Sequence, residues 1–269
     1  MNGSDERRVA ARIRREPPQF RRVAVEGIER VSPRLVRVTL GGAELEGLTV
    51  AQPAASVRLL LPSPGANELV MPAWNGNEFL LPDGTRPAIR TFTPRRVDPE
   101  ALELDVEIVL HGGGVAAGWA EAAEVGAPAA VSGPGRGYSI ERDTPAFLLA
   151  GDETAIPAIS QLLETLPAEA TVQVYVEVVE ASARIALPGH PQAAVEWCQL
   201  APAAEPGDAF TAAVRTAEVP PDTRVWAAGE AAAVQRLRRH FFEERGLPRS
   251  WASIRGYWKR GRAGDAGDD

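Results

Sequence analysis

The chain has 269 residues, of which 45% are hydrophobic, so it is long enough to bury the cores of two domains. Its net charge of −7 argues against a general polyanion binder, and we expect no nucleic-acid partner. The single cysteine, Cys198, can form neither an internal disulfide nor a thiolate cluster, so we expect no metal site built by the protein.

The first 18 residues are polar and end in Pro17-Pro18, which predicts a flexible N-terminal arm at 1–18. This segment lacks the apolar core of a signal peptide, and no run in the chain reaches 18 apolar residues. We therefore expect a cytoplasmic protein without a membrane span, and we expect it to be a monomer.

Residues 19–143 have the pattern of β-strands. Aliphatic and β-branched runs at 34–40, 56–61 and 102–110 are separated by glycine- and proline-containing turns. In the run at 102–110 the apolar residues fall on one face and the acids on the other. Many short strands with such turns predict a small antiparallel Greek-key barrel.

The pattern changes after Thr144. Short apolar strands at 146–151, 171–179 and 224–229 alternate with segments of helical spacing, which begin near Ile156 and Val234. This alternation predicts a parallel sheet in an α/β domain at 144–248. Residues 249–269 are expected to form a C-terminal helix and tail.

The sequence RTFTPRR at 90–96 combines a cation, an aromatic ring and hydroxyl groups. The Arg90 guanidinium is always charged and can bind a diphosphate with two hydrogen bonds. Phe92 can stack on a flat ring, and Thr93 can offer its hydroxyl to the edge of that ring. The alternative is an ordinary barrel strand with outward arginines and an inward Phe92.

The sequence HGGGVAAGWA at 111–120 follows the strand at 102–110. Its glycines let the backbone approach a ligand, and a helix starting near Val115 or Ala116 would offer free N–H groups to a phosphate. The loop has no lysine, so it is not a P-loop. The alternative is a glycine-rich connection before an amphipathic helix.

The sequence AGDETAIPAI at 150–159 joins a buried strand to a helix, which places ligands at the carboxyl edge of a parallel sheet. Asp152 and Glu153 would repel a pyrophosphate, so we expect this loop to face the nicotinamide end of a dinucleotide. Asp152 or Thr154 can also serve as a helix cap.

These three segments, together with WAAGE at 226–230 and GYWKRG at 256–261, occur in order over nearly the whole chain. In this respect the sequence resembles the siderophore-interacting proteins, the ferric-siderophore reductase branch of the ferredoxin–NADP reductase-like superfamily. The resemblance implies an FAD-binding barrel at 19–143 and an NAD(P)H-binding α/β domain at 144–248. It also implies that electrons pass from NAD(P)H through FAD to siderophore-bound Fe(III), which is released as Fe(II).

The resemblance implies roles for matching positions. Thr93 would lie at the reactive flavin edge. Phe92 stands where the family usually has tyrosine, and GVAA at 114–117 stands where it often has GPAS, so two side-chain hydroxyl contacts are lost. The FAD contacts would be Arg90, Thr91, Phe92, Thr93, His111, Gly112, Val115, Ala116, Ala117 and Trp119. The nicotinamide side would be formed by Gly151, Asp152, Glu153, Thr154, Ala155, Gly229 and Glu230.

Many ferric siderophores are anionic, so we expect a basic rim near the flavin that attracts them. The candidates are Arg95, Arg96, Lys259 and Arg260. Lys259 is the only lysine of the chain, and an ammonium, unlike a guanidinium, can give up a proton as iron leaves. The alternative for Lys259 is a solvated charge on a C-terminal helix.

The choice between NADH and NADPH stays open at this stage. Glu177 or Glu180 at the end of the second parallel strand could bind ribose hydroxyls and favour NADH, whereas Arg184 could bind a 2′-phosphate. The resemblance favours NADPH. Two other functions stay open, a general FAD-dependent diaphorase or electron-transfer module, and a siderophore-binding protein without activity.

Overall fold

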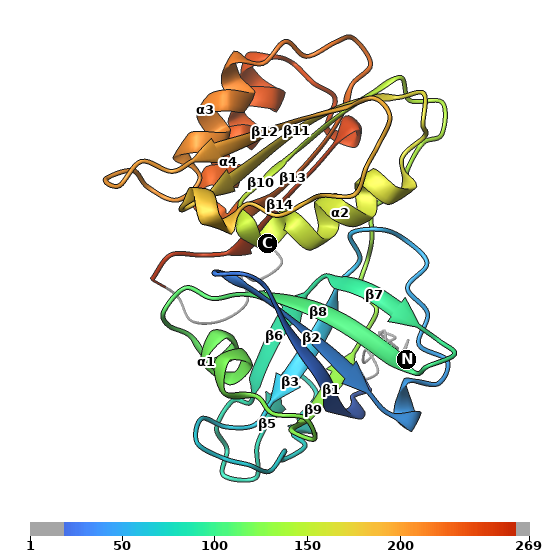
Figure 1. Cartoon of the computed structure of the whole chain (residues 1–269), viewed down its shortest axis with the longest axis vertical. Helices are drawn as coiled ribbons and strands as arrows, with labels where there is room; N and C mark the ends of the chain where they lie inside the picture. The colour runs from blue at the N-terminus through green and yellow to red at the C-terminus, as the bar shows by residue number, and fades with distance from the viewer. Residues whose placement is uncertain (1–18, 262–269) are drawn as a thin grey trace, which may run out of the picture.

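The computed structural model describes residues 19–261, which form two halves stacked along the long axis of the molecule (Figure 1). The lower half is a seven-stranded antiparallel sheet in the order β6-β3-β9-β1-β2-β8-β7. The upper half is a five-stranded parallel sheet in the order β12-β11-β10-β13-β14. The predicted arm at 1–18 lies outside the described residues.

The antiparallel sheet closes on itself. Its two edge strands, β6 and β7, are separated in sequence by Thr93 alone, so the sheet must curl until its edges meet at that residue. This confirms the predicted barrel. The strands are β1 (Arg21–Ser32), β2 (Leu35–Gly41), β3 (Val57–Leu61), β6 (Ala88–Phe92), β7 (Pro94–Asp98), β8 (Glu103–Val109) and β9 (Pro128–Ser132). A small hairpin of β4 (Ala73–Trp74) and β5 (Phe79–Leu80) and the helix α1 (Val115–Ala122) complete this half.

The alternation predicted for 102–110 is confirmed in β8. Leu104 and Val106 are fully buried in the barrel core. Asp105 and Glu107 point the other way and are also buried, because arginine side chains cover them: Arg96 Nε lies 2.9 Å from Asp105 Oδ2, and Arg37 Nη2 lies 2.6 Å from Glu107 Oε1. The outer face of this strand is therefore a paired polar surface.

The parallel sheet has helices on both faces. Its strands are β10 (Ala146–Gly151), β11 (Thr171–Val178), β12 (Ala193–Gln199), β13 (Arg224–Glu230) and β14 (Ala252–Trp258). Helix α2 (Ile156–Thr165) packs on the face toward the barrel, whereas α3 (Asp208–Thr216) and α4 (Ala231–Arg239) cover the other face (Figure 1). The predicted α/β half is confirmed, while the predicted boundary near 143–145, between β9 and β10, stays a prediction.

The helix predicted from residue 249 is wrong. Residues 252–258 form β14, which pairs in parallel with β13 at the edge of the sheet, after a short 3₁₀ turn at Arg249–Trp251. The segment contains Ile254, Tyr257 and Trp258, which favour strands, and Gly256, which weakens a helix interior. The charged residues that follow concealed this strand signal.

Within residues 19–261, no helix combines the length and apolar character needed to cross a bilayer.

Candidate cofactor and substrate site

The barrel and the parallel sheet meet at Thr93 and Tyr257, a contact that we call the seam. Thr93 is the buried residue between β6 and β7, and its side chain lies beside that of Tyr257 in β14. Burial raises the pKa of the Tyr257 phenol, although the neighbouring Thr93 hydroxyl opposes this shift. The closing point of the barrel therefore touches the last strand of the other half.

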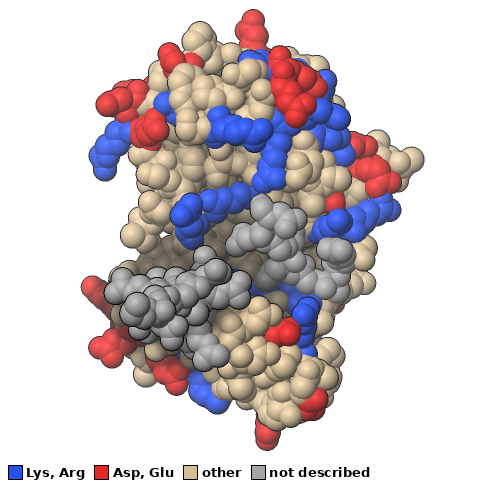
Figure 2. Space-filling model, turned by 180° about the vertical axis from the view of Figure 1, so that it is seen from behind, with Lys and Arg blue, Asp and Glu red and all other residues tan. Residues whose placement is uncertain are grey.

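The surface is hollowed between the two halves. The space-filling view shows this hollow with lysine and arginine side chains along its upper side, on the α/β half (Figure 2).

Three polar links fasten the α/β half to the barrel. The Arg34 Nε group donates to both carboxylate oxygens of Glu153, at 3.0 and 2.9 Å. The Gln161 side chain of α2 donates to the Pro94 carbonyl and accepts from the Ala54 backbone N–H. The third link is an ion pair between Arg95 of β7 and Glu164 of α2, with 2.7 Å between Nη2 and Oε1. The relative position of the two halves is thus set by side chains on one face of the barrel.

Strand β6 carries the predicted flavin contacts of the RTFTPRR segment. The Arg90 guanidinium donates to the Ile89 carbonyl at 2.7 Å, and no carboxylate in the described part of the chain pairs with it. Phe92 is partly buried against the barrel core, where the alternative interpretation places it, and Thr91 is exposed. Arg90 therefore keeps most of its N–H groups for an anion, while stacking by Phe92 stays a prediction.

The loop before α1 fits a phosphate. The helix begins at Val115, as predicted, and its N-cap Gly114 has no side chain to cap the first turn, which also contains no acid. A Cβ atom built on Gly112 or Gly113 would meet nothing within 4 Å, so the backbone there faces open space. The free N–H groups of this first turn and the positive end of its dipole suit an anionic group such as a diphosphate.

The flanking residues of this loop have structural contacts. The His111 ring is 3.1 Å from a Cβ built on Gly114, so the imidazole lies against the turn. Trp119 and Ala117 pack on the barrel core and hold α1 in place. The residues of this loop thus fit an FAD diphosphate through backbone groups, with side chains that support the loop.

In the α/β half, by contrast, buried carboxylates occupy the helix starts. Glu177 accepts hydrogen bonds from the backbone N–H groups of Gly207, Ala209 and Phe210 at the start of α3. Burial raises the pKa of the Glu177 carboxyl. Glu230 accepts hydrogen bonds from the backbone N–H groups of Ala232 and Ala233 at the start of α4. A pyrophosphate is therefore kept away from these two helix termini.

Several predicted nicotinamide contacts need correction. Asp152, Glu153 and Glu230 are only 7%, 6% and 5% exposed, and their carboxylates bind protein donors instead of facing a ligand. Thr154 donates to Asp152 through its backbone and its hydroxyl, so Asp152 is the cap of a 3₁₀ turn at Glu153–Ala155. Glu177, proposed for ribose hydroxyls, is 3% exposed and caps α3.

Gly151 and Gly229 also serve internal packing. A Cβ on Gly151 would lie 2.4 Å from the Ala228 carbonyl oxygen and from the Ala155 Cβ, and a Cβ on Gly229 would lie 2.6 Å from Asp152 Oδ2. The ends of β10 and β13 therefore approach each other as closely as glycine permits.

The predicted basic rim is only partly assembled. Arg95 is paired with Glu164 at the link between the halves, and Arg96 is paired with Asp98, Glu103 and Asp105 on the barrel surface. These pairs give both guanidinium groups a structural role, and their binding of a siderophore stays a prediction.

The other two predicted cations, Lys259 and Arg260, directly follow β14. Arg260 contacts Glu205, while Lys259 is exposed and pairs with no carboxylate in residues 19–261. Lys259 is thus the predicted cation that stays available to an anionic substrate.

Arg184 and Glu180 lie on the exposed loop after β11, and neither has an ion-pair partner among the described residues. This position at the carboxyl edge of the sheet is compatible with a dinucleotide ribose. No group of three or more His, Cys, Asp or Glu side chains in the described chain could hold a metal ion.

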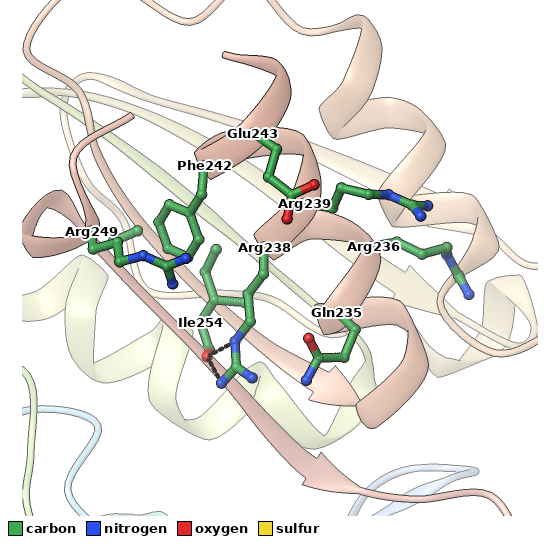
Figure 3. A pocket seen from close by; sticks show the side chains of 9 residues that line it. Gln235, Arg236, Arg238, Arg239, Phe242, Glu243, Arg249 and Ile254 are labelled. Carbon is green, nitrogen blue, oxygen red and sulfur yellow. Dashed lines mark hydrogen bonds between the residues drawn. The ribbon is translucent and has the colours of Figure 1, made fainter. Parts of the chain in front are cut away.

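A separate groove of about 700 Å³ lies along α4 and the first half of β14 (Figure 3). There Arg238 donates twice to the Ile254 carbonyl, at 3.1 and 2.6 Å, and the Arg249 guanidinium lies 4.8 Å from the centre of the Phe242 ring. Most of these residues belong to α4 or follow it, on the sheet face away from the barrel, so the groove is not part of the seam.

The match to known families follows the same division into two halves. Residues 24–138 match the model of the siderophore-interacting FAD-binding domain, and residues 144–261 match that of the siderophore-interacting protein. The chain belongs to the siderophore-interacting protein family.

Similar proteins cover nearly the whole chain. A siderophore utilization protein from T. fusca, known from its crystal structure, is 34% identical with a TM-score of 0.82, over 92% of this chain and 95% of that one. The ferric vibriobactin reductase ViuB of Vibrio cholerae is 30% identical, over 88% of each chain. The NADPH-dependent ferric-chelate reductase of Escherichia coli (strain K12) is 31% identical, over 89% of this chain and 93% of the relative.

Proposed function

We propose that this siderophore-interacting protein is a ferric-siderophore reductase, which passes electrons from NAD(P)H through FAD to siderophore-bound Fe(III) and releases Fe(II). The observation that carries the proposal is the contact between Thr93 and Tyr257. It brings the RTFTPRR segment of the FAD-binding half next to β14, the strand that Lys259 directly follows. The names of two relatives, a ferric vibriobactin reductase and an NADPH-dependent ferric-chelate reductase, support the same reaction.

The residues that would hold FAD lie in the barrel. Arg90 and the N–H groups at Val115, Ala116 and Ala117 would bind the diphosphate, because they offer positive charge and free donors without a carboxylate nearby. Thr93 would lie at the flavin edge that faces the other half. When bound, FAD accepts two electrons from a pyridine nucleotide and passes them on singly, as ferric iron requires.

The pyridine nucleotide would enter at the carboxyl edge of the parallel sheet. Because Glu177 and Glu230 occupy two helix starts there, its phosphates must be bound by side chains. Arg184 is exposed and unpaired among the described residues, whereas Glu177 is not available to a ribose. The exposed Arg184, together with the name of the NADPH-dependent ferric-chelate reductase relative, supports NADPH as the donor. We propose the cytoplasm, where that donor is found, as the site of action.

Lys259 would act on the siderophore. Its exposed ammonium raises the local concentration of an anionic ferric complex, and it can donate a proton to a ligand oxygen as the Fe–O bond weakens on reduction. Hard oxygen ligands hold Fe(III) more tightly than Fe(II), so the released iron can be trapped by a chelator specific for Fe(II).

The test uses the FAD-loaded protein without oxygen, with NADPH, a ferric hydroxamate or ferric catecholate siderophore, and a coloured Fe(II) chelator. We expect NADPH to bleach the flavin absorption and the ferric siderophore to restore it while the Fe(II) complex forms. Bleaching without Fe(II) formation from any siderophore would indicate a general diaphorase. A protein that takes up no FAD would indicate a siderophore-binding protein without activity.

In the same assay Lys259→Ala is expected to lower the rate of Fe(II) formation about tenfold, as loss of a charge-assisted contact does, with no change in the rate of flavin bleaching. Equal changes in both rates, or no change in either, would contradict the role of Lys259 at the siderophore.

A further inference from the structure

Strand β14 contains a bulge close to the seam. Gly229 of β13 lies opposite Gly256, but the next residue, Glu230, lies opposite Trp258, so Tyr257 is an extra residue without a partner in β13. A bulge of this kind redirects the side chains on either side of it. Here the Tyr257 phenol points to Thr93 of the barrel, whereas the Trp258 indole points to Asp152 of the α/β half.

Asp152 is the buried acceptor for the Trp258 indole. The indole Nε1–H donates to Asp152 Oδ2 at 2.8 Å, and the same oxygen accepts the Glu230 backbone N–H at 2.9 Å. The other oxygen accepts the two Thr154 donors. Gly229 passes so close to this carboxylate that a Cβ would lie 2.6 Å from Oδ2. Every hydrogen bond of Asp152 comes from a donor, and these bonds oppose the rise in the pKa of its carboxyl that burial causes.

Glu230 holds the other side of the same short segment. One of its oxygens caps α4 by accepting the Ala232 and Ala233 N–H groups, and the other accepts the Arg260 backbone N–H at 3.3 Å. Trp258 and Arg260 are therefore each bonded to a buried carboxylate. Lys259 lies between them, with an exposed side chain that is unpaired in the described chain.

We propose that Asp152 and Glu230 are positioning residues that fix the segment 258–260 at two points and thereby hold Lys259 beside the seam. This inference rests on the proposed function, because it assigns a purpose to the fixed position of the lysine. A lysine on a free tail must lose backbone and side-chain freedom when it meets the substrate, whereas here the backbone is already ordered. The contacts of Asp152 and Glu230 with segment 258–260 thus lower the entropy cost of binding an anionic ferric complex, although neither carboxylate contacts that complex.

The same contacts could instead serve only to secure the end of the edge strand. The two roles differ in whether Trp258 acts through Lys259. If it does, loss of the indole N–H matters only while the lysine is present, and the two substitutions are not additive. If Trp258 only stabilises the strand, its loss has the same effect with and without Lys259.

The experiment therefore uses Trp258→Phe, Lys259→Ala and the double variant, each loaded with FAD. Trp258→Phe keeps a six-membered aromatic ring and removes the N–H donor together with the five-membered ring of the indole. Steady-state kinetics with a ferric siderophore give KM and kcat, and stopped-flow bleaching by NADPH gives the flavin rate. The matched control is Trp251→Phe, a tryptophan before β14 whose ring contacts Arg224 at 4.1 Å.

We expect Trp258→Phe to raise KM for the ferric siderophore about two- to tenfold, as loss of one hydrogen bond does, and to leave flavin bleaching unchanged. In the Lys259→Ala background it should have no further effect on KM, and Trp251→Phe should have none in either. An unchanged KM, or an equal rise in both backgrounds, would overturn the inference.

Asp152→Asn provides a second route to the same contact. This substitution puts an amide nitrogen in place of one carboxylate oxygen, so one hydrogen-bond acceptor is lost. We therefore expect KM for the ferric siderophore to rise, and we expect no further rise when Trp258→Phe is added. Additive effects of these two substitutions would overturn the inference, provided that FAD absorption shows a folded protein. If NADPH bleaches the flavin of the wild-type protein but no ferric siderophore is reduced at all, the proposed function itself fails. This outcome differs from failure of the positioning role, in which the wild-type protein reduces the siderophore and the variants do not behave as expected.

Discussion

The ion pair between Arg34 and Glu153 gives a quantitative test of how the two halves are joined. Arg34→Met removes the guanidinium but keeps an apolar stem of similar length. The Glu153 carboxylate then stays buried with only the Val179 backbone N–H, at 3.2 Å, as a donor. Because an uncompensated buried charge is unfavourable, we expect the variant to be less stable.

The exposure of the two side chains sets the size of the effect. Loss of one partner from a fully buried pair costs about 3–5 kcal/mol, whereas an exposed pair contributes about 0–1 kcal/mol. The Arg34 and Glu153 side chains are 22% and 8% exposed, which lies between these limits. We therefore expect a loss of about 2 kcal/mol in the free energy of unfolding, or about 4–8 °C in Tm.

The loss should depend on pH in a defined direction. Burial raises the pKa of Glu153, and Arg34 opposes that shift, so the variant has a carboxyl group whose pKa lies further above its unfolded value. A raised pKa in the folded state gives stability that is lost as pH rises. The deficit of Arg34→Met relative to wild type should accordingly shrink when the pH falls from about 7.5 to about 5.

Thermal and urea unfolding of the FAD-loaded protein measure these differences. The control is Arg86→Met, because the Arg86–Glu78 pair is 82% and 34% exposed and should contribute little. Replacing both partners, with Arg34→Met and Glu153→Leu, should restore much of the loss, since no charge is left buried. A deficit no larger than that of Arg86→Met, or one that grows in acid, would refute this account of the link.

Three other substitutions test the assignments of single residues. Arg90→Ala should weaken FAD binding about tenfold or more, measured by flavin titration, because a charge-assisted contact to the diphosphate is lost; Arg30→Ala, at an exposed position of β1, is the control, and FAD affinity equal to wild type would remove Arg90 from the site. Arg184→Ala should raise KM for NADPH more than KM for NADH, and an unchanged ratio would exclude a contact with the 2′-phosphate. Glu177→Ala should lower the free energy of unfolding by about 1–3 kcal/mol, because the first N–H groups of α3 lose their acceptor, while NAD(P)H affinity should not fall; a fall would restore Glu177 as a ribose ligand.

Much of the fold could be predicted because the core strands carry their own pattern. The strands β2, β3, β8, β10, β11 and β13 and the helices α2 and α4 lie where period-two or helical spacing placed them. The helix predicted in place of β14 is the main exception. β14 lies at the sheet edge and gains its order from β13, and its aromatic and glycine residues were outweighed by the charges that follow it.

Some features of the candidate site could be predicted because they depend on an uncapped helix start or on a charge without a partner. The uncapped start of α1, the unpaired Arg90 and Lys259 were all singled out from residue type and spacing. The roles of the carboxylates were not, because whether Asp152 faces a ligand or the interior depends on how closely Gly229 approaches it. Likewise the contact between Thr93 and Tyr257 joins residues far apart in sequence, and no local pattern encodes it.

The three polar links between α2, the 3₁₀ turn and the barrel have a consequence for turnover. Arg34–Glu153, Arg95–Glu164 and the two contacts of Gln161 leave no free hinge between the halves. NAD(P)H and the ferric siderophore must then enter and leave a site that stays open, without a movement of one half relative to the other. We accordingly expect kcat to be insensitive to solvent viscosity, because no large-scale breathing motion accompanies each catalytic cycle.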